Sequence, residues 1–133
     1  MNKKLVVDTG ALALFFMGDT RIKPYFDAIE AKRAVGYMCS VNLAEYGYKT
    51  CQKLGSDTAH LRYQQIHTLL QQVEIDYHLS QAAADEKCRN NSLSLVDSFA
   101  LALARNLKAT LLTTDSELGK SKHIEVRLFQ VKS

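Results

Sequence analysis

The sequence lacks the features that divide a chain into separate units. Proline occurs once and glycine six times among 133 residues. No stretch rich in serine and glycine suggests a linker, and we find no internal repeat and no low-complexity segment. Because 47% of the residues are hydrophobic, one domain of this length can bury a substantial core. We therefore predict a single domain over residues 1–133.

Cysteine is scarce, and its spacing excludes the common cysteine-based sites. Cys39, Cys51 and Cys88 form no CxxC pair, so neither a zinc knuckle nor a thioredoxin-type motif is indicated. The four histidines are equally scattered and show no metal-ligand spacing. We expect reduced thiols, as in a cytoplasmic protein.

The chain has no long hydrophobic run. The longest apolar stretch, from Ala11 to Met17, is too short to span a bilayer. Met1 to Lys4 lead into only three aliphatic residues before Asp8, which is unlike a signal peptide. We expect a cytoplasmic protein with no membrane contact.

Short apolar runs alternate with helical patterns along the chain. The runs predict strands at 5–7, 34–39, 73–77, 109–113 and 124–129. The segments between them predict helices at 10–17, 21–33, 40–54, 56–72, 80–88 and 94–107. Strands separated by helices imply right-handed crossovers and a parallel sheet covered on both faces. The predicted fold is a three-layer α/β/α sandwich with four to five strands.

Four acidic residues stand near the expected junctions between strands and helices: Asp8, Glu45, Asp97 and Asp115. The carboxyl ends of parallel strands share one edge, where ligands bind. Four carboxylates gathered there would repel one another unless a cation lay among them. Hard divalent ions prefer oxygen ligands, so the pattern predicts a Mg²⁺ or Mn²⁺ site.

Each acid also has a purely structural interpretation. Asp8 can cap the helix that follows it, since aspartate is a favoured N-cap. Glu45 can complete a capping box with Asn42, or pair with Lys49 one helical turn later. Asp97 stands three positions after a serine, which is a second capping box. Asp115 is an ordinary loop aspartate when taken alone, and the joint pattern is what favours a metal site.

Other enzyme classes with a similar start fit less well. A haloacid dehalogenase needs a second aspartate two positions after the first, and Gly10 stands there. A receiver domain wants a lysine after a late strand, whereas Ser116 and Glu117 follow Asp115. Neither GxGxxG nor GxxxxGK[ST] is present, which argues against dinucleotide-binding and P-loop proteins.

The segments around the four acids resemble the PIN-domain nuclease family and, within it, the VapC-type toxins. The matching segments are Val6-Val7-Asp8-Thr9, Leu43-Ala44-Glu45, Leu95-Val96-Asp97-Ser98-Phe99-Ala100-Leu101-Ala102 and Leu112-Thr113-Thr114-Asp115. Their order, their spacing and the total length agree with the family, so the resemblance covers essentially the whole chain. Each segment is degenerate, and it is the ordered set that is specific.

The resemblance implies a PIN-like three-layer fold and a metal-dependent ribonuclease that hydrolyses RNA phosphodiester bonds. It implies that Asp8, Glu45, Asp97 and Asp115 are the catalytic and Mg²⁺- or Mn²⁺-binding residues, and that the products carry 5′-phosphate and 3′-hydroxyl ends. Family members often act on transfer or ribosomal RNA, form homodimers and are inhibited by a cognate antitoxin. In some relatives the last acid is shifted or doubled, so Glu117 is a further candidate.

We interpret Asp8 and Asp97 as the direct metal ligands, and Glu45 as a ligand through water or a base. With 17 basic and 14 acidic residues, the chain is mildly basic, which suits a polyanionic substrate and equally suits ordinary solubility. Candidates for contact with RNA are Lys49, Arg89, Arg105 and Lys120 for phosphates, and Tyr46 and Tyr48 for bases. Two alternatives stay open: a PIN-fold module that binds RNA or protein without cutting, and an RNA-processing nuclease without an antitoxin.

Overall fold

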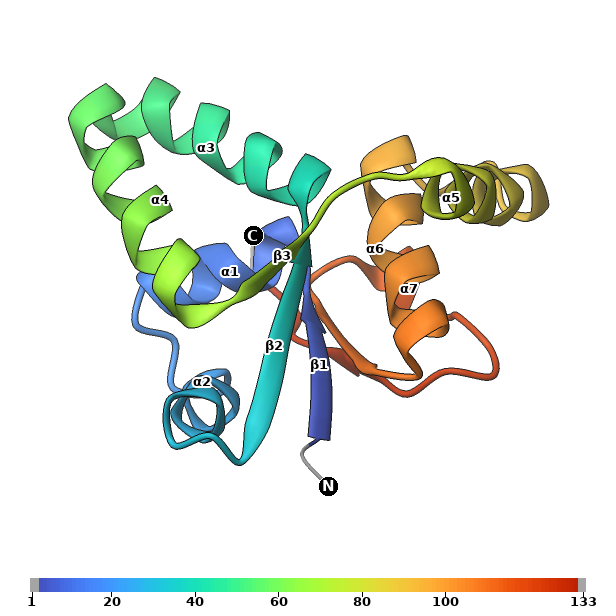
Figure 1. Ribbon diagram of the computed structural model, residues 1–133, viewed down its shortest axis with the longest axis horizontal. Coiled ribbons are helices and arrows are strands. Elements are labelled where there is room, and N and C mark those ends of the chain that lie inside the picture. Colours follow the sequence, from blue (N-terminus) through green and yellow to red (C-terminus); the bar gives the residue numbers. More distant parts are fainter. Residues whose placement is uncertain (1–2, 132–133) are drawn as a thin grey trace.

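The computed structural model describes residues 3–131 and contains a five-stranded sheet between two layers of helices (Figure 1). The strands are β1 (Lys3–Val7), β2 (Ala34–Cys39), β3 (Gln71–Val73), β4 (Thr110–Thr113) and β5 (Val126–Leu128). Their order is β3-β2-β1-β4-β5, and every neighbouring pair is parallel. The predicted three-layer α/β fold is confirmed. Residues 1, 2, 132 and 133, which the predicted domain includes, lie outside the described residues.

The helices form two groups on opposite sides of the sheet, which Figure 1 shows almost edge-on. The first group is α1 (Thr9–Phe16), α2 (Lys23–Glu30), α3 (Ser40–Leu54) and α4 (Ser56–Leu69). The second group is α5 (Tyr77–Arg89), α6 (Leu95–Leu107) and the short α7 (Ser116–Gly119). Over residues 3–131, no helix combines the length and the apolar character that crossing a membrane requires.

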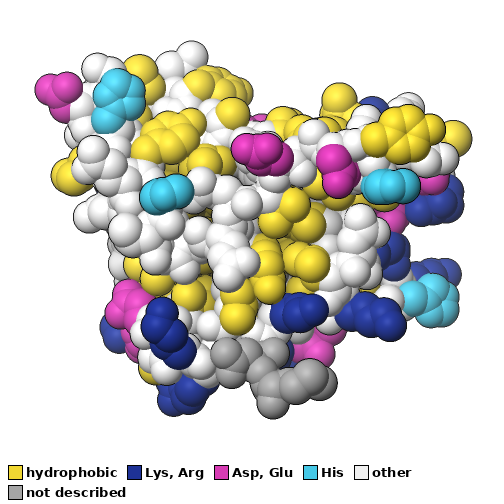
Figure 2. Space-filling view, viewed as in Figure 1, with side chains coloured by type: hydrophobic (Ala, Val, Ile, Leu, Met, Phe, Trp, Pro, Cys, Tyr) yellow, Lys and Arg dark blue, Asp and Glu magenta, His cyan; other side chains and the backbone are white. Residues whose placement is uncertain are grey.

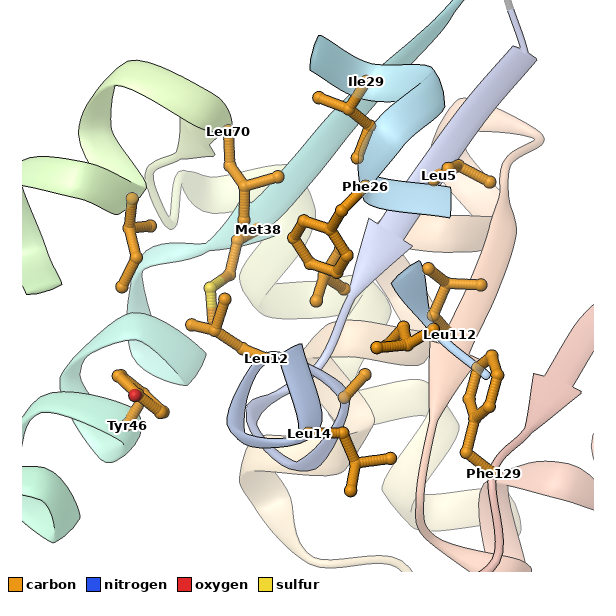
Figure 3. Packing of buried hydrophobic residues seen from close by; sticks show 14 of the residues in the cluster. Leu5, Leu12, Leu14, Phe26, Ile29, Met38, Tyr46, Leu70, Leu112 and Phe129 are labelled. Atoms are coloured by element: carbon orange, nitrogen blue, oxygen red, sulfur yellow. The ribbon is translucent and has the colours of Figure 1, made fainter. Parts of the chain in front are cut away.

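The central strands are buried on both faces, so the core has two halves. In β1, Leu5 and Val7 belong to the half under α1 and α2, whereas Val6 belongs to the half under α6. Figure 3 shows the first half, where Leu12 of α1 and Phe26 of α2 pack among side chains from the strands. This double burial explains why β1 and β4 carry consecutive apolar residues, Leu5 to Val7 and Leu111 to Leu112, rather than alternating ones.

The third strand and the helix after it differ from the prediction. The alternating residues 73–77 suggested a strand, but β3 is Gln71–Val73 and α5 already begins at Tyr77. Val73 pairs with Cys39, the last residue of β2, so the pairing stops where the neighbouring strand stops. The Asp76 carboxylate then accepts a hydrogen bond of 2.8 Å from the Leu79 N–H and caps α5, in place of the predicted start at residue 80.

Other predicted elements exist with shifted ends. The predicted helix 21–33 is only Lys23–Glu30, and Lys32 has a left-handed backbone with φ of 62°. The predicted helix 56–72 ends at Leu69, because Leu70 is extended and leads directly into β3. The last strand is Val126–Leu128, shorter than the predicted 124–129.

Candidate functional site

All four predicted acids line one cavity of about 530 Å³. Asp8 follows β1, Glu45 lies in α3, Asp97 lies in the first turn of α6, and Asp115 follows β4. The cavity therefore collects carboxylates from four separate parts of the chain at the carboxyl edge of the sheet. Their role as metal ligands stays a prediction, since the geometry alone assigns no chemistry.

Asp8 is a helix cap and a cavity residue at once. One carboxylate oxygen, Oδ1, accepts a hydrogen bond of 2.8 Å from the Ala11 N–H and caps α1. The other, Oδ2, accepts a hydrogen bond from the hydroxyl of Thr113. Asp8 is only 3% exposed. Burial is the main reason why its pKa rises to about 6, and the charges of Asp115 and Glu45 raise the pKa further, against the two hydrogen bonds.

Thr113 is a site residue that the sequence analysis missed. This fully buried last residue of β4 donates its hydroxyl hydrogen to Asp8 and accepts a hydrogen bond of 2.9 Å from the Asp115 N–H. One hydroxyl thus fixes the positions of two of the four acids. Thr113 lies beside Asp8 because β4 pairs with β1, and the order of the elements along the chain does not reveal this pairing.

Asp97 reaches the cavity by a different route from the one predicted. Helix α6 follows α5 rather than a strand, so the expectation of a strand before each acid is wrong here. The predicted cap is confirmed, because Ser94 Oγ accepts a hydrogen bond of 3.0 Å from the Asp97 N–H. Burial, followed by hydrogen bonding to Asp115 and the charge of that residue, raises the pKa of Asp97 to about 7.

Asp115 is fixed by the short helix that it opens. Its Oδ1 accepts hydrogen bonds from the N–H groups of Glu117 at 2.7 Å and Leu118 at 3.3 Å. Glu117 itself does not line the cavity, and its carboxylate forms an ion pair of 3.1 Å with Lys120. By its position, Glu117 is therefore the least favoured of the five candidate metal ligands.

Glu45 forms the predicted pair with Lys49 rather than a capping box. The two side chains lie 3.8 Å apart, one helical turn from each other. Helix α3 begins at Ser40 after an extended Cys39, so Asn42 lies inside the helix and cannot cap it. Asn42 is fully buried and donates a hydrogen bond of 3.4 Å to the Thr9 hydroxyl, which ties α3 to α1 behind the acids.

The donor set fits a hard divalent cation. The candidate ligands are all carboxylate oxygens, and within residues 3–131 no Lys, Arg or His forms an ion pair with Asp8, Asp97 or Asp115. No group of three or more Asp, Glu, His or Cys side chains in this described part is arranged to hold an ion by itself. Mg²⁺ commonly uses one or two carboxylates and keeps several waters, which this arrangement allows.

The predicted phosphate contacts are largely elsewhere. Of the four basic candidates, only Lys49 lines the cavity. Arg89 and Arg105 both bind the buried Glu86, at 3.3 and 2.6 Å, and Lys120 pairs with Glu117. Arg105 thus joins α6 to α5, whereas Arg89 pairs with Glu86 within α5. Figure 2 shows further Lys and Arg side chains along the lower part of the molecule, near the amino ends of β1 and β2.

Of the two tyrosines considered for base stacking, Tyr46 lines the cavity with its ring packed in the core, and Tyr48 is exposed outside the cavity. Tyr46 is 5% exposed, and its ring stacks on that of Phe16 with 5.6 Å between the centroids. Its hydroxyl accepts a hydrogen bond from Arg62. Tyr48 is 53% exposed but does not line the cavity.

Two cationic side chains besides Lys49 line the cavity. They are Lys53 and Arg62, which the sequence analysis did not single out.

A comparison with protein families identifies the class to which this site belongs. The family model for the PIN domain matches residues 5–123. The chain therefore belongs to the PIN-domain family, a family of nucleases, as its sequence segments predicted. A comparison with curated proteins gives no match.

Solved structures with the same fold include VapC-type toxins. VapBC2 from Rickettsia felis, bound to a promoter DNA fragment, has a TM-score of 0.78 at 12% identity, over 96% of this chain and 99% of that one. VapC20 from Mycobacterium tuberculosis, described as a sarcin-ricin loop cleaving toxin, has a TM-score of 0.71 at 20% identity, over 92% and 98%. A toxin–antitoxin complex from Klebsiella pneumoniae has a TM-score of 0.74 at 16% identity, over 96% and 99%. At these identities the likeness concerns the fold alone.

Proposed function

We propose that this PIN-domain protein is a Mg²⁺- or Mn²⁺-dependent endoribonuclease and the toxin of a type II toxin–antitoxin pair. The observation that carries the proposal is the single cavity lined by Asp8, Glu45, Asp97 and Asp115. The raised pKa values of Asp8 and Asp97, about 6 and about 7, support it, because burial and neighbouring carboxylates make both negative charges unfavourable unless a cation is bound.

The proposed roles follow from how each carboxylate is held. Asp8 and Asp97 bind the ion directly, since Thr113 and the first turn of α6 fix their positions. Asp115 contributes from the start of α7, where its Oδ1 is already occupied by backbone N–H groups. Glu45, held only by the long pair with Lys49, is free to orient a water molecule or accept its proton.

A bound Mg²⁺ or Mn²⁺ ion supplies Lewis-acid chemistry, lowering the pKa of water and stabilising charge on the phosphate. The protein supplies the carboxylates, which its backbone and side chains hold in place, and it orients the RNA strand. The expected products carry 5′-phosphate and 3′-hydroxyl ends.

The direct test is cleavage of RNA by the purified protein with Mg²⁺ or Mn²⁺, compared with EDTA and with Asp97→Asn. We expect the variant to stay folded, because the backbone N–H of residue 97 still donates its hydrogen bond to the capping Ser94 hydroxyl whatever the side chain is. Cleavage should fall by more than about a hundredfold, the range for loss of a central catalytic group. Full activity in folded Asp97→Asn, with an unchanged response to metal, contradicts the assignment.

The partners in this proposal are an RNA substrate, a second copy of the chain and a cognate antitoxin. Support for the antitoxin comes from the fold shared with the toxin–antitoxin complex described above. A small reading frame beside the gene, encoding a DNA-binding segment and a helical tail, should yield a protein that binds this one and blocks cleavage. Light scattering of the purified chain measures the homodimer.

The main alternative is a PIN-fold module that binds RNA or protein without cutting it. All four acids are present and face one cavity, which favours the nuclease. Thermal unfolding with and without millimolar Mn²⁺ separates the two, because a bound ion raises stability by mass action. An RNA-processing nuclease without an antitoxin is the second alternative, and the neighbouring reading frame distinguishes it.

A further inference from the structure

The cavity with the four acids has a second wall that carries positive charge. Lys49 and Lys53 of α3 and Arg62 of α4 line this wall. Lys49 already lies 3.8 Å from Glu45. Lys53 and Arg62 form no ion pair with any acid among residues 3–131. Negative and positive side chains therefore share one cavity, and within residues 3–131 its cationic side chains come from α3 and α4.

Arg62 is held in place before any ligand binds. Its Nη1 donates a hydrogen bond of 2.9 Å to the Tyr46 hydroxyl. Its guanidinium carbon lies 4.9 Å from the centre of the Phe16 ring, on which Tyr46 also stacks. Tyr46, which Figure 3 shows on α3, belongs to the buried cluster on this side of the sheet. Arginine has five N–H donors, and a half-buried guanidinium without a carboxylate is suited to bind a phosphate.

The cavity also has apolar side chains that reach into solvent. Met17 at the end of α1 is 77% exposed, and Leu54 at the end of α3 is 54% exposed, and both line the cavity. A paired duplex shows a protein mainly its phosphates and groove edges, whereas an unpaired strand also offers base faces. Cations beside exposed apolar groups therefore favour a single strand.

We propose that Lys53 and Arg62 form a phosphate-binding subsite for the unpaired RNA strand that flanks the scissile bond. This inference rests on the proposed function, since it takes the acids as the point of cleavage. The strand crosses from the acidic end of the cavity onto the α3–α4 wall, where Lys53 and Arg62 each contact one phosphate.

The test is the salt dependence of RNA binding in the non-cleaving Asp97→Asn background. Binding of a labelled oligouridylate is measured by anisotropy between about 50 and about 200 mM salt for Lys53→Ala, Arg62→Met and Arg62→Lys. Loss of one phosphate contact on a single strand makes the plot of log K against log salt shallower by about 0.7. The affinity lost in each charge-removing variant should thus be about 2.6-fold greater at the lower salt concentration than at the higher one. Arg62→Lys should recover the slope but only part of the affinity, because lysine keeps the charge and lacks the planar group.

Lys23→Ala is the matched control, because Lys23 is an exposed lysine on α2 that pairs with Asp27 at 2.9 Å and lies outside the cavity. Its salt slope should equal that of the parent. A self-complementary RNA duplex should bind more weakly, with a slope that the variants leave unchanged. In the protein with Asp97 intact, Lys53→Ala should raise KM and leave kcat within about twofold, as expected for uniform binding.

The outcomes separate this inference from the proposed function. If folded Lys53→Ala and Arg62→Met keep the parent's slope while RNA is still bound and cut, the subsite is refuted and the nuclease stands. If the duplex binds as well as the single strand, the preference for an unpaired strand is refuted. If the parent neither binds nor cuts RNA, the proposed function itself fails. Lys53 is exposed, so its variant tests the subsite even if Arg62→Met unfolds the packing on Phe16.

Discussion

Replacing Asp8 by asparagine should flatten the pH dependence of stability of the metal-free protein. The pKa of Asp8 rises from an ordinary 3.8 to about 6 in the folded chain, chiefly because the carboxyl group is buried. A raised carboxyl pKa means that the folded state favours the protonated form. The resulting stabilisation is complete below the unfolded value and is lost as pH rises through about 6.

The size of the effect follows from the same two pKa values. Their difference corresponds to about 3 kcal/mol in full, of which about 1.4 kcal/mol is lost between about pH 5 and about pH 8. For a chain of this size, that loss lowers Tm by roughly 5 °C. Asparagine carries no charge and caps a helix as well as aspartate does, so Asp8→Asn should lack this component while α1 keeps its start. Asp97 adds to this pH dependence, because burial, Asp115 and, last, the charge of Asp8 raise its pKa; Asp8→Asn removes the Asp8 contribution.

The assay is urea or thermal unfolding in EDTA at the two pH values, for the parent and for Asp8→Asn. Groups common to both proteins, including Asp19 and Glu125 with their lowered pKa values, cancel in the difference. Asp85→Asn removes the same charge from an exposed position on α5 and provides the control. If the stability difference between the parent and Asp8→Asn is the same at both pH values, burial does not destabilise the Asp8 charge.

Three further predictions concern the residues around the cavity. Thr113→Val removes the hydroxyl that joins Asp8 to the Asp115 backbone. It should lower the free energy of unfolding in urea by about 1–3 kcal/mol and weaken Mn²⁺ binding. Unchanged stability and Mn²⁺ affinity would contradict the role of this hydroxyl in positioning Asp8 and Asp115. Gly10→Ala places a Cβ 1.9 Å from the Thr114 hydroxyl oxygen. The variant should therefore lose about 1–3 kcal/mol of unfolding free energy and most RNA cleavage. Unchanged stability and cleavage would contradict the close approach of Thr114 to Gly10. Mn²⁺ at about a hundred times its Kd should stabilise the parent by about 2.7 kcal/mol and Asp8→Asn far less, and EDTA should reverse the gain; an equal shift in both proteins excludes Asp8 as a ligand.

Much of the fold could be predicted because its signals are local. A strand buried on both faces must be a short apolar run, and Leu5 to Val7 have that form. The start of α6 was readable for the same reason, since the capping Ser94 hydroxyl and the Asp97 N–H that donates to it are three residues apart. The predicted strand at 73–77 failed because a local alternation cannot show where the partner strand β2 ends.

The acids of the cavity were predictable as an ordered set, whereas the residues that support them were not. Asp8 and Asp115 each stand beside a local signal, the end of an apolar run. Thr113 touches Asp8 only because β4 lies next to β1, and that contact joins residues 105 positions apart. Arg62 belongs to an ordinary helical pattern, and only its packing on Phe16 and Tyr46 distinguishes it from other surface arginines.

Helix starts and catalytic candidates coincide in this chain, since Asp8 opens α1 and Asp115 opens α7. Asparagine fills an N-cap as well as aspartate does, and the codons of the two residues differ by one nucleotide. A single point mutation at either position can therefore silence the enzyme and spare its architecture. Under the proposed function, lineages of this protein have a short evolutionary path to inert copies that still fold and still bind a cognate antitoxin.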